Sequence, residues 1–193
     1  MRIILGSQSP RRKEILDYFS LPFEQIDSQF DESLVPFKGD PATYAIEIAR
    51  GKSATLIQLY PDAAILTADT VVYKEPYCYG KPQDDRHAFK MLKELQGSWH
   101  SVFTGVAFSY QNQTFSDVEE TKVLFNPLTD SQIHQYLKAM HWSDKAGGYA
   151  IQFAGSLLVR KIEGCYYNVL GLPINVVAPL LSKANIDLWD YLK

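Results

Sequence analysis

The sequence has few cysteines, no long apolar run and no excess of basic residues, and each of these absences excludes a class of protein. Its 193 residues include only two cysteines, Cys78 and Cys165, which lie far apart and lack the C-x-x-C spacing of a zinc site. No apolar run approaches the roughly 18 residues that span a bilayer, so we expect no membrane partner. The net charge of −3 disfavours binding to a nucleic-acid polymer.

The composition is that of a folded globular protein. Hydrophobic residues make up 46% of the chain and aromatic residues 13%, which is too much apolar surface to leave in water. No repeat, low-complexity segment or linker divides the sequence, so residues 1–193 are expected to form a single domain. The first residues carry only a short apolar stretch, which is not typical of a signal peptide. Together with the scarcity of cysteine, this predicts a cytoplasmic location.

Helices and strands are expected to alternate along the chain. Capping residues, first-turn prolines and apolar repeats predict helices at about 9–19, 42–60, 85–97 and 129–140, and a last helix of about ten residues from Pro173. Apolar and β-branched runs predict strands at 3–5, 64–73, 101–110, 114–125, 148–153 and 156–162, with a hairpin turn at 111–113. This order predicts an α/β fold with a mixed sheet.

The segment Gly6–Arg12 follows a predicted strand and opens a predicted helix. Free backbone N–H groups, the hydroxyls of Ser7 and Ser9, and the guanidinium groups of Arg11 and Arg12 gather there, and all of them suit a phosphate. The spacing is neither G-x-x-x-x-G-K-[ST] nor G-x-G-x-x-G. An ordinary capped helix with solvated arginines is the alternative interpretation.

Two lysines stand in unusual places. Lys52 falls on the apolar stripe of a predicted helix, four residues after Ile48 and four before Leu56, so it either snorkels at the rim or points into a cleft. Lys81 lies in Gly80-Lys81-Pro82, where the glycine and proline hold it in a fixed turn. A plain exposed turn lysine is the alternative for Lys81.

Two carboxylates and one amide complete the set of candidates. Asp69 interrupts an otherwise buried strand, which costs several kcal/mol unless the carboxylate is paired, binds a metal or faces a cavity; a buried aspartate capping a loop is the alternative. Glu32 lies beside Asp31 in a polar loop, where a solvated acidic pair is the alternative. Gln152 follows a glycine-rich loop and has both a donor and an acceptor for a base edge.

Taken together, these candidates suit the hydrolysis of a nucleoside triphosphate. The cations would bind the polyphosphate, and the carboxylates would hold a divalent metal and activate water.

The chain closely resembles the Maf family of nucleoside triphosphate pyrophosphatases. The resemblance runs from Ile3 to about Leu181 and rests on several motifs in the family's order: SQSPRRKEIL at 7–16, TADTVV at 67–72, GKPQD at 80–84, SVFTGV at 101–106, DKAGGYAIQ at 144–152 and YYNVLGLP at 166–173.

The resemblance implies a long, bent mixed sheet flanked by helices, with two lobes around a deep cleft, similar to the inosine triphosphate pyrophosphatases. It implies hydrolysis between the α- and β-phosphates, giving a monophosphate and pyrophosphate, with Mg²⁺ or Mn²⁺ as cofactor. A homodimer is compatible with it. Carried over position by position, Asp69 is the implied proton acceptor, and the other implied catalytic-site residues are Glu32, Lys52 and Lys81, alongside Ser7 and Arg12. From the residue chemistry we further expect the phosphates to lie against the helix start at Ser9 and against Arg12, Lys52 and Lys81, with a divalent metal held by Glu32 and Asp69.

Three positions bear on the nucleobase. Arg11, Thr70 and Gln152 match the members that act on dTTP and UTP, whereas the sister group acting on 7-methyl-GTP tends to carry Trp, Gln and Glu there. Modified pyrimidine nucleotides fit the same pattern. The chain departs from the family at Phe153, where glycine is usual, and at Gly6, where alanine is usual.

Three alternative functions stay open. The first is a 7-methyl-GTP pyrophosphatase of the same family. The second is a sugar-1-phosphate nucleotidyltransferase, although the Gly-x-Gly core of that class is absent from 6–9. The third is a non-enzymatic nucleotide-binding regulator of cell division, which would have no need of both the carboxylates and the lysines.

Overall fold

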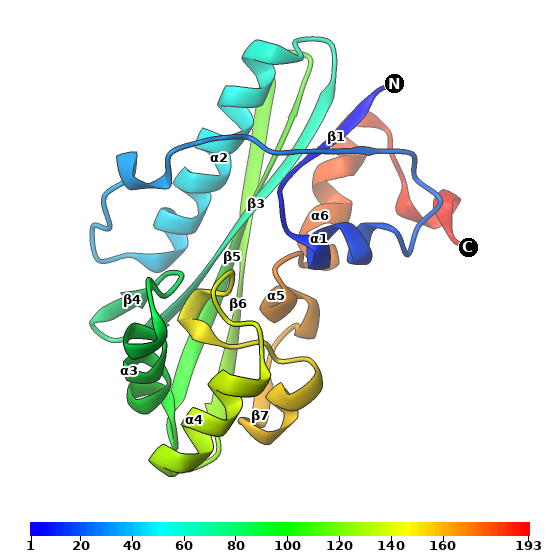
Figure 1. The fold of residues 1–193 in the computed structure, drawn as a ribbon. Helices are drawn as coiled ribbons and strands as arrows, with labels where there is room; N and C mark the ends of the chain where they lie inside the picture. The colour runs from blue at the N-terminus through cyan, green and yellow to red at the C-terminus, as the bar shows by residue number, and fades with distance from the viewer.

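The structure, a computed structural model, describes residues 1–193 and is built on one mixed sheet of seven strands (Figure 1). The strands are β1 (Ile3–Gly6), β2 (Glu24–Ile26), β3 (Ala64–Lys74), β4 (Tyr77–Tyr79), β5 (Trp99–Tyr110), β6 (Gln113–Phe125) and β7 (Val159–Glu163). The helices are α1 (Pro10–Leu16), α2 (Pro41–Leu59), α3 (Asp85–Leu95), α4 (Asp130–Ala139), α5 (Tyr166–Leu170) and α6 (Ile174–Leu181).

Strand β3 has a gap in its backbone pairing along one of its two sides. The sheet runs β2-β1-β3-β5-β6-β7, with β1 parallel to β2 and β3 and the other pairs antiparallel, so the predicted mixed sheet is confirmed. On one side of β3, pairing with β1 ends at Thr67 and pairing with β4 begins at Val72. Residues 68–71 therefore have no strand partner on that side, and Asp69 and Thr70 lie in this gap.

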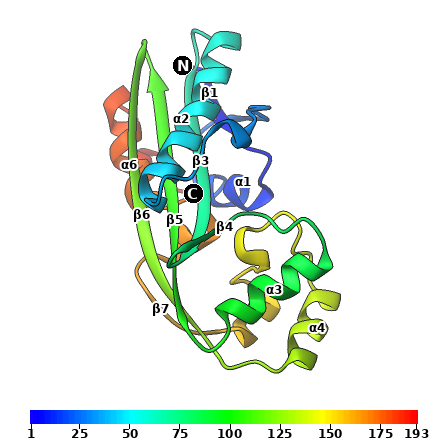
Figure 2. The same ribbon diagram turned by 90° about the vertical axis from the view of Figure 1, so that its left-hand side faces the viewer.

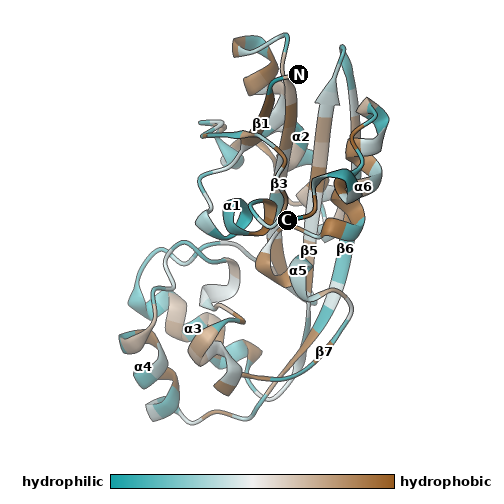
Figure 3. Cartoon of the chain, turned by 90° about the vertical axis from the view of Figure 1, so that its right-hand side faces the viewer, coloured by the Kyte–Doolittle hydropathy of each residue, from teal (hydrophilic) through white to brown (hydrophobic).

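Two hydrophobic cores share the long strands. The upper core of 19 buried residues joins β1, α1 and α6 to one end of β3 and β5. The lower core of 12 buried residues packs α3 and α4 on the other end of the sheet. Strands β5 and β6 run the whole length of the molecule and curve toward α3 and α4 (Figure 2), and hydrophobic residues gather along β1 and β3 (Figure 3). This arrangement confirms the long, bent sheet with two lobes.

Helix α2 is held close to the sheet. It begins as predicted, with the Asp40 side chain accepting the N–H groups of Ala42 and Thr43 and with Pro41 in the first turn. At Gly105 in β5, an added Cβ would lie 2.4 Å from the carbonyl carbon of Ala45 in α2. Only glycine permits this approach, which fixes the height of α2 above the sheet. None of the helices combines the length and apolar character needed to cross a bilayer.

The region after α4 differs most from the prediction. The predicted strand at 148–153 is wrong, because Gly147 and Gly148 adopt φ of +69° and +72° and the chain forms short 3₁₀ turns there. The strand predicted at 156–162 begins only at Val159, since residues 153–157 form another 3₁₀ turn. The first helix ends at Leu16 instead of Phe19. The sequence prediction also omitted α5 and the short strands β2 and β4.

Candidate active site

A cleft of about 1020 Å³ lies between the two lobes, at the gap in the sheet edge. The upper lobe contributes the turn between β1 and α1, and the lower lobe contributes the loop after β4 and the glycine-rich segment after α4. Every residue predicted for the site lines this cleft: Ser7, Ser9, Arg11, Arg12, Glu32, Lys52, Asp69, Thr70, Lys81 and Gln152. The deep cleft expected from the family resemblance is therefore present.

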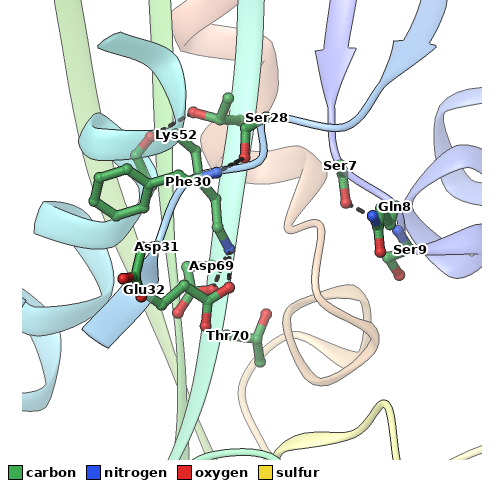
Figure 4. A network of polar contacts seen from close by, with 12 residues as sticks. Ser7, Gln8, Ser9, Ser28, Phe30, Asp31, Glu32, Lys52, Asp69 and Thr70 are labelled. Carbon is green, nitrogen blue, oxygen red and sulfur yellow. Dashed lines mark hydrogen bonds and ion pairs between the residues drawn. The ribbon is translucent and has the colours of Figure 1, made fainter. Parts of the chain in front are cut away.

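Lys52 lies between two carboxylates (Figure 4). Its Nζ lies 2.6 Å from Asp69 Oδ1 and 2.9 Å from Glu32 Oε1. Lys52 and Asp69 are only 8% and 7% exposed, so Lys52 points into the cleft instead of snorkelling at the rim. Asp69 is paired, as a buried carboxylate must be. Glu32 begins a single 3₁₀ turn that Asp31 caps by accepting the N–H of Ser33.

The two carboxylates have different electrostatic surroundings. Burial raises the pKa of Asp69, although the charge of Lys52 opposes that shift. Burial acts in the same direction on Glu32, but the positive charges of Lys52, Lys81 and Arg12 outweigh it, and the pKa of Glu32 is lowered. Glu32 therefore stays ionised, while Asp69 is the more basic carboxylate. When both carboxylates are ionised, the group of Lys52, Glu32 and Asp69 carries a net charge of −1.

Arg12 is held by three hydrogen bonds from its guanidinium group. Nε donates to Gly171 O (2.7 Å), Nη1 to Ser7 Oγ (3.2 Å) and Nη2 to Thr70 Oγ1 (3.0 Å). Ser7 Oγ also accepts the backbone N–H of Ser9 (3.1 Å). A guanidinium has five N–H donors, so two stay available for a ligand. Arg12 is thus fixed in the wall of the cleft and is not a solvated arginine.

The remaining candidates lie around the mouth of the cleft. Arg11 Nη1 lies 3.3 Å from Oδ2 of Asp144, which comes from the segment after α4 in the other lobe. Ser9 occupies the N-cap position of α1 but makes no capping side-chain hydrogen bond. Lys81 is exposed in the loop after β4. Neither Lys81 nor Gln152 has a side-chain partner within the chain, so both are free to contact a ligand.

The sequence did not single out three residues that hold this site together. Asp144 pairs with Arg11, and Thr104 and Asn168 form hydrogen bonds behind Thr70. The available signal for Thr104 was a threonine within the apolar stretch of a predicted strand. Asn168 lies in the motif at 166–173, which supported the family resemblance but gave no role to this residue.

The carboxylates fit a divalent cation that is also bound by a substrate. Asp69 Oδ2 and Glu32 Oε2 have no hydrogen-bond partner, whereas the opposite oxygen of each contacts Lys52. Oxygen ligands of this kind suit Mg²⁺ or Mn²⁺. No cluster of three or more metal-binding side chains exists in the structure. Two carboxylates would therefore supply part of the coordination, as in sites where Mg²⁺ also binds substrate phosphates and water.

The fold and the site define an α/β protein with a cleft between two lobes that is lined by both cationic and acidic side chains. The chain belongs to the Maf-like protein family, whose model matches residues 2–184. It is 45% identical to the dTTP/UTP pyrophosphatase of Chlamydia caviae, over 99% of this chain and 98% of that protein. It is 40% identical to the nucleoside triphosphate pyrophosphatase of Chlamydia muridarum, again over 99% and 98%.

Among solved structures, the Ham1 protein of Staphylococcus aureus is similar, with a TM-score of 0.45 and 14% sequence identity. The superposition covers 65% of this chain and 72% of that one. The family assignment depends on the sequence matches and not on this partial likeness.

Proposed function

We propose that this protein hydrolyses nucleoside triphosphates between the α- and β-phosphates and that it prefers dTTP and UTP. The observation that carries the proposal is the buried Lys52 between Asp69 and Glu32, in a cleft that also contains Arg12 and Lys81. The names of the relatives from C. caviae and C. muridarum support the same reaction. The matching residues Arg11, Thr70 and Gln152 support the choice of pyrimidine.

Asp69 is proposed to take a proton from the attacking water. Its raised pKa makes it a better base than an ordinary aspartate, while Lys52, at 2.6 Å, holds the carboxylate in one orientation. The water oxygen forms a bond to the α-phosphorus in line with the leaving group. The bond between the α-phosphorus and its bridging oxygen breaks, and pyrophosphate leaves with that oxygen. The proton passes from the water to Asp69.

The cations are proposed to bind and orient the triphosphate. Arg12 offers its two remaining N–H donors from a fixed position, and Lys81 approaches from the other lobe. Ser9 adds an unused hydroxyl at the start of α1. Prior positioning of these groups lowers the barrier because little reorganisation is left for the reaction itself. The Gln152 amide matches the alternating acceptors and donor on the edge of a uracil-type base.

Glu32 and Asp69 would hold the divalent cation through their free oxygens, Oε2 and Oδ2. A bound Mg²⁺ or Mn²⁺ supplies charge neutralisation to the phosphates. The ionised state of Glu32, which nearby cations favour, keeps this oxygen available at neutral pH. A cytoplasmic location and a homodimer belong to the same proposal.

The test is pyrophosphate release in the presence of Mg²⁺ or Mn²⁺ from dTTP, UTP, CTP, the purine triphosphates and 7-methyl-GTP. We expect turnover of dTTP and UTP, and we expect Asp69→Asn to reduce kcat by about 10³-fold, within the usual range for loss of a general base. Binding of a non-hydrolysable dUTP analogue should persist in that variant. Asp117→Asn, at an exposed position of β6 outside the cleft, is the matched control.

The same assay separates the alternatives. Full activity of Asp69→Asn would overturn the proposed mechanism. Preference for 7-methyl-GTP would overturn the pyrimidine assignment, and a need for a sugar phosphate would favour a nucleotidyltransferase. Tight nucleotide binding by the wild-type protein without any turnover would favour the regulator.

A further inference from the structure

A chain of hydroxyl groups leads from Arg12 into the middle of the sheet. Arg12 Nη2 lies 3.0 Å from Thr70 Oγ1, which lies 2.9 Å from Thr104 Oγ1. Thr104 Oγ1 in turn lies 2.9 Å from the carbonyl oxygen of Asn168. Thr104 and Asn168 are both 0% exposed. The chain therefore crosses from α1 through β3 and β5 to α5 without contact with solvent at its inner end.

The direction of these hydrogen bonds is fixed by the number of protons. A carbonyl oxygen only accepts, so Thr104 must donate its single hydroxyl proton to Asn168 O. Thr70 must then donate its own proton to Thr104. Thr70 Oγ1 is left as an acceptor, and Arg12 Nη2 donates to it. Thr104 thereby decides which way the Thr70 hydroxyl points.

Thr104 does not belong to the wall of the cleft. It pairs directly with Thr70 across β3 and β5, so the two side chains share one face of the sheet. Asp69, the neighbour of Thr70, faces the opposite side and meets Lys52 from α2. Thr104 is absent from the lining of the cleft. Any effect of Thr104 on a ligand must therefore pass through Thr70.

Both ends of the hydroxyl chain are tied to the same short segment. The Asn168 amide donates to Val102 O and to Thr121 Oγ1, each at 2.9 Å, which fixes the middle of α5 against the sheet. Three residues later, Gly171 O accepts from Arg12 Nε at 2.7 Å. This segment thus holds the guanidinium directly through Gly171 and indirectly through Asn168, Thr104 and Thr70.

We propose that Thr104 is a positioning residue for the hydrolysis of nucleoside triphosphates, because it orients Thr70 and through it keeps the two free N–H groups of Arg12 directed at the substrate phosphates. The expected effect of Thr104 on the rate of hydrolysis rests on the proposed function. The expected immobility of the Arg12 side chain does not rest on it, because it follows from the hydrogen bonds alone.

The first experiment compares Thr104→Val with Thr67→Val in steady-state hydrolysis of dTTP. Thr67 is a matched control, since it is also 0% exposed, donates to a backbone carbonyl (Ala49 O, 2.7 Å) and lies outside the cleft lining. We expect Thr104→Val to lower kcat/KM about tenfold, the usual effect of one lost hydrogen bond near a charged group. Thr67→Val should change it less than about twofold, and Thr104→Ser should restore it.

A double-mutant cycle tests whether Thr104 acts through Arg12. In the Arg12→Lys background, Thr104→Val should cause no further loss of kcat/KM, because the guanidinium group that contacts Thr70 is no longer present. An equal loss in both backgrounds would overturn the proposal. So would a loss of kcat/KM in Thr67→Val equal to that in Thr104→Val, since a general disturbance of the core would then explain both.

The second readout needs no turnover. In uniformly ¹⁵N-labelled protein, the Nε–H signal of Arg12, identified by its loss in Arg12→Lys, should exchange with solvent slowly. Thr104→Val should speed that exchange at least about threefold, whereas Thr67→Val should leave it unchanged. Unchanged exchange in Thr104→Val would overturn the proposal even if nucleotides are hydrolysed. Wild-type protein without any pyrophosphatase activity would refute the proposed function and leave this test of Thr104 intact.

Discussion

His100 is a buried imidazole beneath the wall of the cleft. It is 3% exposed, its Nε2 lies 2.8 Å from the hydroxyl of Tyr149, and its ring packs edge-on against Phe125. Its Nδ1 is buried without a partner. Burial, assisted by the charge of Lys74, lowers the pKa of His100 from 6.5 to about 3. The folded protein therefore holds His100 neutral where the unfolded chain would bind a proton.

The stability of the protein should reflect this difference. Because the folded pKa lies below the unfolded one, the contribution of His100 is complete above pH 6.5 and is lost as the pH falls toward 3. In that window this residue should add up to about 1.4 kcal/mol of lost stability per pH unit. His100→Gln, which does not titrate, should show a shallower decline. Urea unfolding at about pH 7.5, 6 and 5 compares the two, and parallel curves would contradict the assignment.

Phe153 occupies a backbone conformation suited to glycine. Its φ is +54°, and the residue is 81% exposed, so no packing offsets the strain. We expect Phe153→Gly to raise the free energy of unfolding by about 0.5–1 kcal/mol, since relief of strain outweighs the added freedom of the unfolded chain. Chemical denaturation at neutral pH measures the change.

Leu157 supplies the control for Phe153. It is 72% exposed in the same 3₁₀ turn but does not adopt a positive φ. Leu157→Gly should therefore lower the stability, because glycine adds only unfolded-state freedom there. Stabilisation by both substitutions, or by neither, would show that the backbone at Phe153 is not strained.

Elements with a local signal could be predicted from the sequence, and elements that depend on distant contacts could not. The proline and aspartate before α2, and the reciprocal hydrogen bonds of Thr129 and Gln132 at α4, act within one helical turn. The short strands β2 and β4, which the sequence did not predict, exist because neighbours pair with them. Helix α5, of only five residues, has too few turns for a periodic pattern.

The candidate site shows the same division. Asp69 and Lys52 could be found because each breaks an apolar pattern in its own element. Their contact could not, because it depends on how closely α2 approaches β5 at Gly105. The place of Glu32 depends on Phe30, whose ring lies where a Cβ at Gly51 would come within 2.3 Å. Glu32 was identified through the family resemblance, because a polar loop has no apolar periodicity that a charged residue could interrupt.

At the scale of the whole molecule, the two lobes are joined by strands and not by a linker. Strand β3 contributes Leu66 to the upper core and Val72 to the lower one, and β5 contributes Phe108 and Val102 in the same way. The cleft lies between the cores, so its two walls are connected through a continuous ladder of backbone hydrogen bonds. A lobe that unfolded alone would leave half of each strand without a packed face.

We therefore propose that residues 1–193 unfold as one cooperative unit, in keeping with the single domain expected from the sequence. Calorimetry should show one transition with equal calorimetric and van't Hoff enthalpies. Leu5→Ala in the upper core and Leu92→Ala in the lower core, both 0% exposed in the wild type, should each lower the stability by about 2–5 kcal/mol. Each should shift that single transition as a whole. Two transitions, with each variant moving only its own, would show instead that the lobes are separate domains and that the cleft is an interface able to open without unfolding.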